Sequence, residues 1–577
     1  MTDETIVGRF LSANAPTEEE ISKLEAFFTN KIGKSVQIMW TKDETIEKGF
    51  VLKILNDVYD NTPAGLLANL KSTIDAIDVA KENYVSLVKE SIESWTPQAS
   101  RYEVGTVKSV ADGVARVVNL KNVKYGEILV FEGGEKGLVL DLAEEEVGCI
   151  LFDDDNVVAG EKVYKTGKTA GIPVSEEILG RVVNALGEPI DGKGSFAADK
   201  YMPVENSAPA IIDRSPVNRP LKTGILTVDA MFPIGKGQRE LIIGDRQTGK
   251  TSIALDTILN QKGKNVVCVY CAVGQKISAV KRLVKTLEKN GAAEYTVVVL
   301  SSAADSSSLQ YIAPFSACAV GEYFMNKGKD VLVVYDDLSK HAVAYRTLSL
   351  LLGRSPGREA YPGDIFYLHS RLLERSAQLS ADKGGGSMTA LPIVETLDGD
   401  ISAYIPTNVI SITDGQLFLE SELFLSGQRP AVNVGLSVSR VGGNAQTKAM
   451  KQAVGALRLE LAQYREMKTF AQFSGDLDES VKRQFAFGKA LTELLVQPSG
   501  RPYTEWQEIV ALVASLARIT ENMSSDVMHA FFDEFFPFFN ETHPEVIADI
   551  EKTRILSEEN KKVITETATL FVEENNV

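Results

Sequence analysis

The sequence is poor in the residues that build disulfide scaffolds and metal centres. Its 577 residues include four cysteines and four histidines. Cys268 and Cys271 have the CxxC spacing, but they lie in the near-continuous apolar run 265–273, which is typical of a buried parallel strand. No second cysteine pair or histidine pair completes a zinc site with them. We therefore expect buried, reduced thiols in a reducing compartment, and neither a redox motif nor a zinc site.

The chain also has little that would suit a membrane or a nucleic acid. No apolar run approaches the ~20 residues of a membrane-spanning helix, and the first residues show no basic segment followed by an apolar one, so no secretory signal is expected. The net charge of −17 argues against a nucleic-acid-binding surface. Hydrophobic residues make up 44% and charged residues 24%, as in ordinary globular proteins, and the length allows about three or four domains.

Residues 244–251 contain a complete Walker A motif, Gly244-x-x-x-x-Gly249-Lys250-Thr251. The motif follows the apolar stretch 240–243 and precedes the helix-like stretch 252–259, which is the strand–loop–helix context that a phosphate-binding loop needs. We expect Lys250 to reach the β and γ phosphates and the Thr251 hydroxyl to bind Mg²⁺. The alternative, a glycine-rich turn with a solvated lysine, is disfavoured because every fixed position of the motif is present. The predicted nucleotide-binding residues of this segment are Gly244, Asp245, Arg246, Gln247, Thr248, Gly249, Lys250, Thr251 and Ser252.

A second motif lies downstream, where the apolar stretch 330–335 ends in Asp336 and Asp337. An apolar strand that ends in Asp is a Walker B pattern, which is weak alone and stronger behind a Walker A motif. We expect Asp336 to hold Mg²⁺ through water.

The periodicity of apolar residues predicts a multidomain α/β protein. Short strands between Gly and Asp/Asn turns favour a small antiparallel barrel, alternating strands and helices favour a parallel sheet, and the last part has only helical spacing. The N-terminal part, with a capping box at its first helix, is expected to be a helix–strand–strand–helix unit. The predicted units are an α+β unit at 1–75, a helical linker at 76–101, a β-barrel at 102–168, a nucleotide-binding domain at 169–445 and a helical bundle at 446–577.

From about residue 102 to 540 the chain closely resembles the alpha subunit of F-type ATP synthases. The matching stretches are 244–251, 273–276, 335–340, 356–364, 366–375, 410–416, 435–442 and 470–473. The resemblance implies a β-barrel, a RecA-like domain that binds ATP or ADP with Mg²⁺, and a helical C-terminal domain. It also implies a ring of three alpha and three beta subunits around a gamma shaft, held on the cytoplasmic face of a membrane by other subunits.

The resemblance assigns roles outside the two Walker motifs. Gln275 stands where beta-type subunits have the Glu that polarises the attacking water, and an amide cannot act as a base at neutral pH, so a non-catalytic Mg-ATP site is expected. Arg440 resembles the alpha residue that reaches a neighbouring beta nucleotide and stabilises developing phosphoryl charge. A polar strand end for Gln275 and a structural salt bridge for Arg440 are the alternatives. Arg429, Pro430 and Gln497 match positions near the adenine.

Residues 10–75 have no counterpart in an alpha subunit. Through the short motifs at 15–20, 33–36 and 48–54 they resemble the C-terminal part of the delta subunit, the oligomycin-sensitivity-conferring protein of mitochondria. This resemblance implies a piece of peripheral stalk fused to the ring, at a distance from the barrel set by a charged helix at 76–98.

Two functions therefore stay open. One is an alpha-type, non-catalytic subunit of a rotary, proton- or sodium-translocating ATP synthase or ATPase, anchored to stalk subunits through 1–75. The other is an F-type-like ring repurposed as a motor or scaffold without ion translocation. Gln275 disfavours a third possibility, a self-sufficient ATPase.

Overall fold

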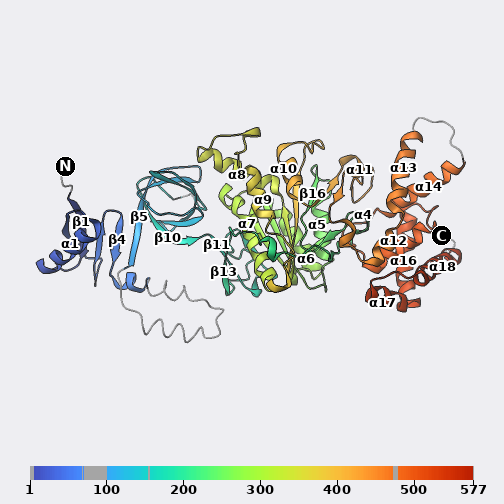
Figure 1. Cartoon of the computed structure of the whole chain (residues 1–577), viewed down its shortest axis with the longest axis horizontal. Coiled ribbons are helices and arrows are strands. Elements are labelled where there is room, and N and C mark those ends of the chain that lie inside the picture. The colour runs from blue at the N-terminus through green and yellow to red at the C-terminus, as the bar shows by residue number, and fades with distance from the viewer. Residues whose placement is uncertain (1–4, 68, 70–99, 154–155, 472–478, 576–577) are drawn as a thin grey trace.

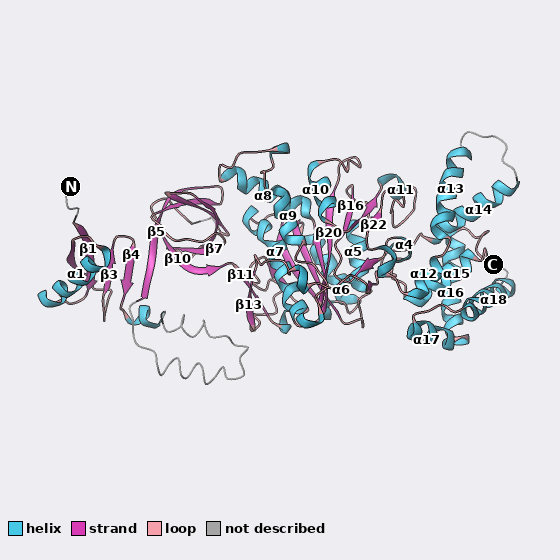
Figure 2. Ribbon diagram, viewed as in Figure 1, coloured by secondary structure: helices cyan, strands magenta, loops and turns pink. Residues whose placement is uncertain are grey.

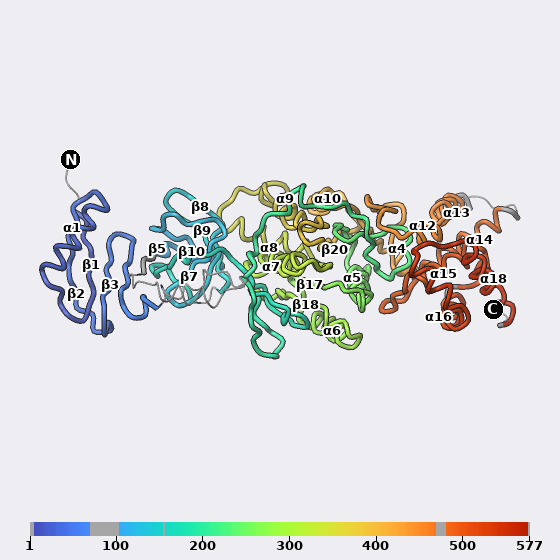
Figure 3. Tube along the Cα trace, turned by 60° about the horizontal axis from the view of Figure 1, so that its bottom comes forward, coloured from blue at the N-terminus to red at the C-terminus, as the bar shows by residue number. Residues whose placement is uncertain are grey.

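The computed structural model describes residues 5–575 apart from 68, 70–99, 154–155 and 472–478. The molecule is elongated. An N-terminal α/β unit, a β-barrel, a nucleotide-binding domain and a helical domain follow one another along its long axis, and both views give the same order (Figure 1, Figure 3).

The N-terminal unit is a small sheet covered on one face by a helix. Its elements are β1 (Ile6–Ser12), α1 (Glu18–Ile32), β2 (Val36–Lys42), β3 (Val51–Ile54) and β4 (Asp57–Asp60). Phe28 of α1 packs on Phe10, Ile38 and Leu52 of the sheet. The expected order was wrong at its start, because a strand precedes the helix. The inward-facing positions of this first strand, β1, include Gly8, where a Cβ would lie 2.9 Å from a side-chain carbon of Ile54. Because Gly8 carries no side chain, β1 lacks the clear apolar alternation that would have predicted a strand. The helix expected beyond residue 67 lies mostly outside the described residues.

The sheet of this unit continues into the barrel. Strand β5 (Ser100–Ala111) pairs antiparallel with β4, from Asp57 opposite Glu103 to Asp60 opposite Ser100. Backbone pairing therefore joins the unit directly to the barrel, and the helical spacer expected at residues 76–98 lies outside the described residues. Residues 100–101 belong to β5 rather than to a helical linker.

The barrel closes because β10 pairs with both β5 and β7. Its interior holds alternate apolar residues such as Val117, Leu129 and Val139, together with Cys149. The strands after β5 are β6 (Val114–Val118), β7 (Glu127–Phe131), β8 (Lys136–Leu142), β9 (Glu146–Leu151) and β10 (Lys162–Thr169). The antiparallel barrel expected from the turn spacing is thus present.

The nucleotide-binding domain is built on an eight-stranded sheet of order β12-β18-β17-β19-β20-β16-β21-β22, parallel except for β22. Helices cover both faces (Figure 2), and each face has its own apolar core. The strands of this sheet are β12 (Val182–Asn184), β16 (Glu240–Gly244), β17 (Val266–Gln275), β18 (Thr296–Ser302), β19 (Asp330–Asp336), β20 (Ser387–Glu395), β21 (Gly415–Leu419) and β22 (Val438–Ser439). The helices are α4 (Leu226–Met231), α5 (Lys250–Leu259), α6 (Ile277–Lys289), α7 (Ser307–Asn326), α8 (Leu338–Leu351), α9 (Ile365–Leu373), α10 (Tyr404–Ile412) and α11 (Ser421–Leu425). Two short pairs, β11 (Gly171–Val174) with β13 (Lys200–Pro203) and β14 (Pro220–Leu221) with β15 (Ile234–Gly235), flank the sheet.

The C-terminal part is a helical bundle whose centre is aromatic. Phe531, Phe535 and Phe539 recur at helical spacing along α16 and are buried. The helices are α12 (Lys448–Val454), α13 (Leu457–Ala471), α14 (Glu479–Leu494), α15 (Glu505–Leu516), α16 (Ser525–Thr542), α17 (Pro544–Thr553) and α18 (Glu558–Asn575). Over the described part of the chain, no helix combines the length and apolarity that crossing a bilayer requires. The described cysteines are all buried and free, as expected.

Candidate nucleotide-binding site

The Walker A segment leaves the buried strand β16 at Gly244 and enters α5 at Lys250. Gly244 has no room for a side chain, because a Cβ would lie 2.3 Å from the Leu419 carbonyl oxygen. Gln247 and Gly249 have left-handed φ angles of 63° and 98°, which turn the loop tightly above the first turn of α5. Such a loop points successive backbone N–H groups towards one spot, and the helix N-terminus adds partial positive charge there.

The Lys250 side chain lies folded against this loop. Its Nζ donates to the Gly244 carbonyl at 2.8 Å and also to the Asp245 carbonyl. Burial lowers the pKa of Lys250, while the carboxylates of Glu395, Asp337 and Asp336 oppose that shift. The ammonium group is therefore held close to the position where phosphate oxygens would meet it.

Asp245 anchors the loop to distant parts of the domain. Its carboxylate accepts hydrogen bonds from the Thr396 hydroxyl at 2.7 Å, the Gly399 N–H at 2.9 Å and the Ser421 hydroxyl at 3.0 Å. Burial opposes ionisation of Asp245, but these hydrogen bonds outweigh it and keep the pKa below its ordinary value. The Thr248 hydroxyl donates back to the Asp245 carbonyl at 2.8 Å, so the loop is braced internally as well.

The side chains of Arg246, within the loop, and Ser252, directly after it, face solvent. The Arg246 side chain is exposed and its Nε donates to Glu395 at 3.1 Å. Ser252, in the first turn of α5, is exposed beside Thr251. Both side chains are thus accessible from solvent.

Asp336 is the point where the two Walker motifs meet. Its Oδ2 accepts hydrogen bonds from the Thr251 hydroxyl at 2.8 Å and the Tyr270 hydroxyl at 2.6 Å. Its Oδ1 accepts one from the Gln275 amide at 3.0 Å. Hydroxyl and carboxylate oxygens are the ligands that Mg²⁺ prefers, so this donor set fits that ion.

The predicted base-side residues lie on the rim of the loop. The Arg429 guanidinium is 4.3 Å from the centre of the Phe424 ring, and that ring approaches Gly249, where a Cβ would lie 3.9 Å from it. Pro430 follows Arg429 through a cis peptide bond. The arrangement places flat groups beside the phosphate-binding loop.

Gln497 has a different environment from the one expected of a base contact. Its amide accepts from the Leu226 N–H at 2.9 Å and donates to the carbonyls of Gly224 and Arg501, both at 2.8 Å. Its own N–H donates to the Arg429 carbonyl at 2.7 Å. Gln497 therefore ties the segment of Arg429 to the start of α4 and to the helical domain.

Arg440 lies far from the chain's own phosphate-binding loop. It follows β22, where Ser439 pairs with Gly415, and Gly415 pairs with Glu240 at the start of β16. The loop leaves β16 at its other end, four residues on, which is about 13 Å along a strand. Arg440 is exposed to solvent.

Sequence reasoning missed the anchoring role of Asp245 and did not identify Tyr270 as a member of the site. The anchoring role of Asp245 depends on residues more than 150 positions away, which no local pattern reveals. Tyr270 was placed in an apolar strand without a role, although a buried tyrosine hydroxyl needs a hydrogen-bonding partner. That requirement was the signal that could have found it.

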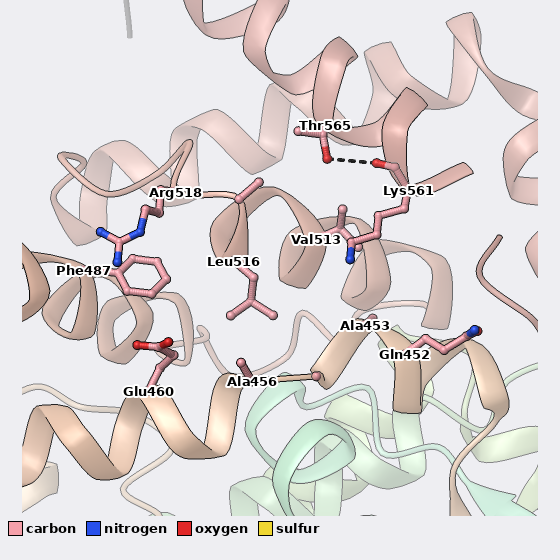
Figure 4. A pocket seen from close by; sticks show the side chains of 12 residues that line it. Gln452, Ala453, Ala456, Glu460, Phe487, Val513, Leu516, Arg518, Lys561 and Thr565 are labelled. Atoms are coloured by element: carbon pink, nitrogen blue, oxygen red, sulfur yellow. Dashed lines mark hydrogen bonds between the residues drawn. The ribbon is translucent and has the colours of Figure 1, made fainter. Parts of the chain in front are cut away.

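A separate hollow of about 400 Å³ lies in the helical domain, between α12, α13, α14, α15 and α18 (Figure 4). Arg518 lies 4.1 Å from the centre of the Phe487 ring and hydrogen-bonds Gln484 at 3.0 Å. It also pairs with Glu521 at 3.3 Å. The guanidinium group is thus engaged within the chain, and this hollow contributes nothing to the site around Lys250.

Comparison with known proteins agrees with this geometry. Models of the ATP synthase alpha/beta family match the β-barrel domain over residues 102–167, the nucleotide-binding domain over 224–439 and the C-terminal domain over 446–571. The ATP synthase subunit alpha of Clostridium botulinum is 53% identical over 503 residues, which covers 86% of this chain and 100% of that protein. The chain belongs to the ATP synthase alpha/beta family. The alpha subunits of Acetivibrio thermocellus and Clostridium kluyveri are each 54% identical, over 86% and 84% of this chain and 98% and 96% of their own lengths.

Membership of this family decides part of the function. The chain is a non-catalytic, nucleotide-binding alpha subunit of an F-type ATP synthase. This membership implies a complex with beta-type and other subunits. The first of the three matched models begins at residue 102. The resemblance of the N-terminal unit to the delta subunit therefore stays a prediction.

Proposed function

We propose that this chain holds Mg-ATP or Mg-ADP between its phosphate-binding loop and Asp336 without hydrolysing it. The observation that carries this proposal is the hydrogen bond from the Gln275 amide to Asp336. By resemblance Gln275 occupies the position of the family's water-polarising Glu, and an amide is too weak a base to take a proton from water at neutral pH.

Each residue of the loop then has a distinct part. The N–H groups of residues 244–252 bind phosphate oxygens, and Lys250 leaves the loop carbonyls to pair with the β and γ phosphates. The Thr251 oxygen and a water held by Asp336 bind Mg²⁺, which neutralises phosphate charge when bound. Arg429 and Phe424 pack beside the adenine, with Pro430 and Gln497 holding that segment in position.

We further propose that Arg440 completes the catalytic site of a neighbouring beta-type subunit in an alpha3beta3 ring around a gamma-type shaft. Its exposure at the end of the sheet away from its own loop supports a role in trans. A planar guanidinium at developing phosphoryl charge stabilises the transition state.

Hydrolysis assays on the purified chain test the non-catalytic assignment. The chain alone should bind Mg-ATP in equilibrium titrations yet release no phosphate, and adding beta-type chains should restore turnover. Rapid hydrolysis by the chain alone would refute the proposal, because another residue would then have to supply the base.

The N-terminal unit is proposed to be delta-like and to dock the peripheral stalk or anchoring subunits, which hold the complex on the cytoplasmic face of the membrane. The β4–β5 pairing supports this role, because it makes the unit a rigid continuation of the barrel rather than a tethered module. A ring would carry three such units while one stalk needs only one. Deleting residues 1–75 should leave ring assembly and hydrolysis intact but lose the stalk subunits from the purified complex. Full recovery of those subunits with unchanged coupling would assign the unit another role.

A further inference from the structure

Tyr270 brings a hydroxyl from the protein interior to the Walker B carboxylate. It lies on β17 and is 2% exposed. On the neighbouring strand β19, Val334 pairs with Tyr270 and Asp336 pairs with Ala272. The tyrosine is therefore two residues from the pairing partner of Asp336 and on the same face of the sheet, and its Oη lies 2.6 Å from Asp336 Oδ2.

The hydrogen bonds that Asp336 already accepts leave few free acceptor sites on its carboxylate. A carboxylate has about four acceptor sites, two on each oxygen. Tyr270 and Thr251 occupy both sites of Oδ2, and Gln275 occupies one site of Oδ1. One site is left on Oδ1, and it can accept a hydrogen bond from one metal-bound water.

The three groups that donate hydrogen bonds to Asp336 would respond differently to nucleotide binding. Thr251 and Gln275 both lie at the phosphate side of the site, so their hydrogen bonds change when phosphate and metal arrive. Tyr270 comes from the buried core and touches neither. Its hydroxyl donates to Asp336 Oδ2 from a buried side chain, and a buried tyrosine hydroxyl needs such a partner.

We propose that Tyr270 is a positioning residue of the Mg²⁺ site: its hydroxyl fixes Asp336 in the orientation that accepts a hydrogen bond from a metal-bound water. The inference rests on the proposed binding of Mg-nucleotide. It adds a residue that stands behind the metal-holding carboxylate and contacts neither nucleotide nor metal. Groups that orient a metal-holding carboxylate typically change metal affinity 10- to 100-fold when they are removed.

The test replaces Tyr270 by Phe in the full chain and follows binding of a fluorescent N-methylanthraniloyl ADP. The Mg²⁺ concentration for half-maximal binding should rise about tenfold or more in Tyr270→Phe. Affinity for the same nucleotide in EDTA should stay within about twofold of the wild-type value, because the phosphate-binding loop is untouched.

Tyr335→Phe is the matched control. Tyr335 is also fully buried, lies on β19 directly before Asp336 and pairs with Cys271. Its side chain belongs to the core on the other face of the sheet, so the same loss of one oxygen should leave Mg²⁺ dependence unchanged. Thermal unfolding of both variants without nucleotide checks that they fold alike.

The possible outcomes separate the two proposals. If the wild-type chain binds nucleotide equally with and without Mg²⁺, the proposed Mg-nucleotide site itself fails. If wild-type binding depends on Mg²⁺ and Tyr270→Phe keeps the same dependence, only the positioning role is overturned. Equal shifts in Tyr270→Phe and Tyr335→Phe, or an equal loss of affinity in EDTA, would likewise overturn it in favour of a purely structural tyrosine.

Discussion

The two ends of strand β16 differ in how charged side chains are placed around them. At its C-terminal end, Lys250 and Asp336 are buried and their polar atoms are engaged with other groups of the chain. Near its N-terminal end, Arg440 is exposed on the edge of the sheet. A site whose groups are positioned by their own chain can bind a ligand alone. An exposed guanidinium can meet a charge that a neighbouring subunit brings to it, which is the role proposed for Arg440.

Arg440→Ala gives the largest effect and tests the exposed end. Turnover of the assembled complex should fall about 10³-fold or more, as for other arginines that stabilise phosphoryl transfer. Nucleotide binding by this chain should not change, because Arg440 lies at the other end of the sheet from its own loop. Steady-state hydrolysis by the reconstituted complex and direct titration of the isolated chain measure the two quantities.

Arg440→Lys sharpens the same result. Lysine keeps the charge but lacks the planar fork, so it should recover little of the lost turnover. Near-normal turnover in the alanine variant would remove Arg440 from the catalytic site.

Lys250→Ala is the corresponding change at the buried end, with a smaller effect. Loss of charge-assisted hydrogen bonds to phosphate should weaken binding of Mg-ATP by about 10- to 100-fold, or ~1.5–3 kcal/mol. Calorimetric titration of the isolated chain measures it. Lys262→Ala, beyond the other end of α5, is the control and should bind as the wild type does. Equal affinities of Lys250→Ala and wild type would contradict the assignment of the loop.

The features of the site differ in how far they could be predicted from the sequence. The loop and Asp336 follow from local patterns, because a glycine-rich turn between a strand and a helix is specified by adjacent residues. The hydrogen bonds of Asp245 to Thr396 and Ser421 depend on how distant segments come together, and no spacing encodes that. The pairing of β4 with β5 was missed for the same reason, since more than 30 residues separate the two strands.

The conflict at Gln497 is informative in another way. Its position along the chain matched an adenine contact, but its side chain is used to hold Gly224, Leu226 and Arg501. Burial and hydrogen bonding decide what a side chain can reach, and neither is visible in a motif. Whether Arg429 or Gln497 contacts the base stays a prediction, and the fold shows that the Gln497 side chain is already hydrogen-bonded within the chain.

Glu508 provides the smallest and most specific test, because it is a buried carboxyl group without a fixed role in nucleotide binding. It lies fully buried on α15, facing Asp229 of α4 across the boundary between the nucleotide-binding and helical domains. Burial, reinforced by the charge of Asp229, raises the pKa of Glu508 well above its ordinary value. Lys222, which opposes that shift, is itself paired with Glu505 at 2.8 Å. Glu508 therefore keeps its proton to a higher pH in the folded chain than in the unfolded chain.

The sign of the resulting pH dependence follows from proton counting. The unfolded chain releases the Glu508 proton near pH 4.3, whereas the folded chain keeps it to a much higher pH. Between these two pKa values the unfolded state binds fewer protons, so stability falls as pH rises, by at most about 1.4 kcal/mol per pH unit. Glu508→Gln removes this contribution. The variant should match the wild type near pH 4 and become progressively more stable than it towards pH 7.5, in urea unfolding followed at several pH values. Glu559→Gln, an exposed position on α18, should show a difference from wild type that does not grow with pH. If Glu508→Gln behaves as that control does, Glu508 is ionised in the folded chain and the boundary between the two domains stabilises its charge.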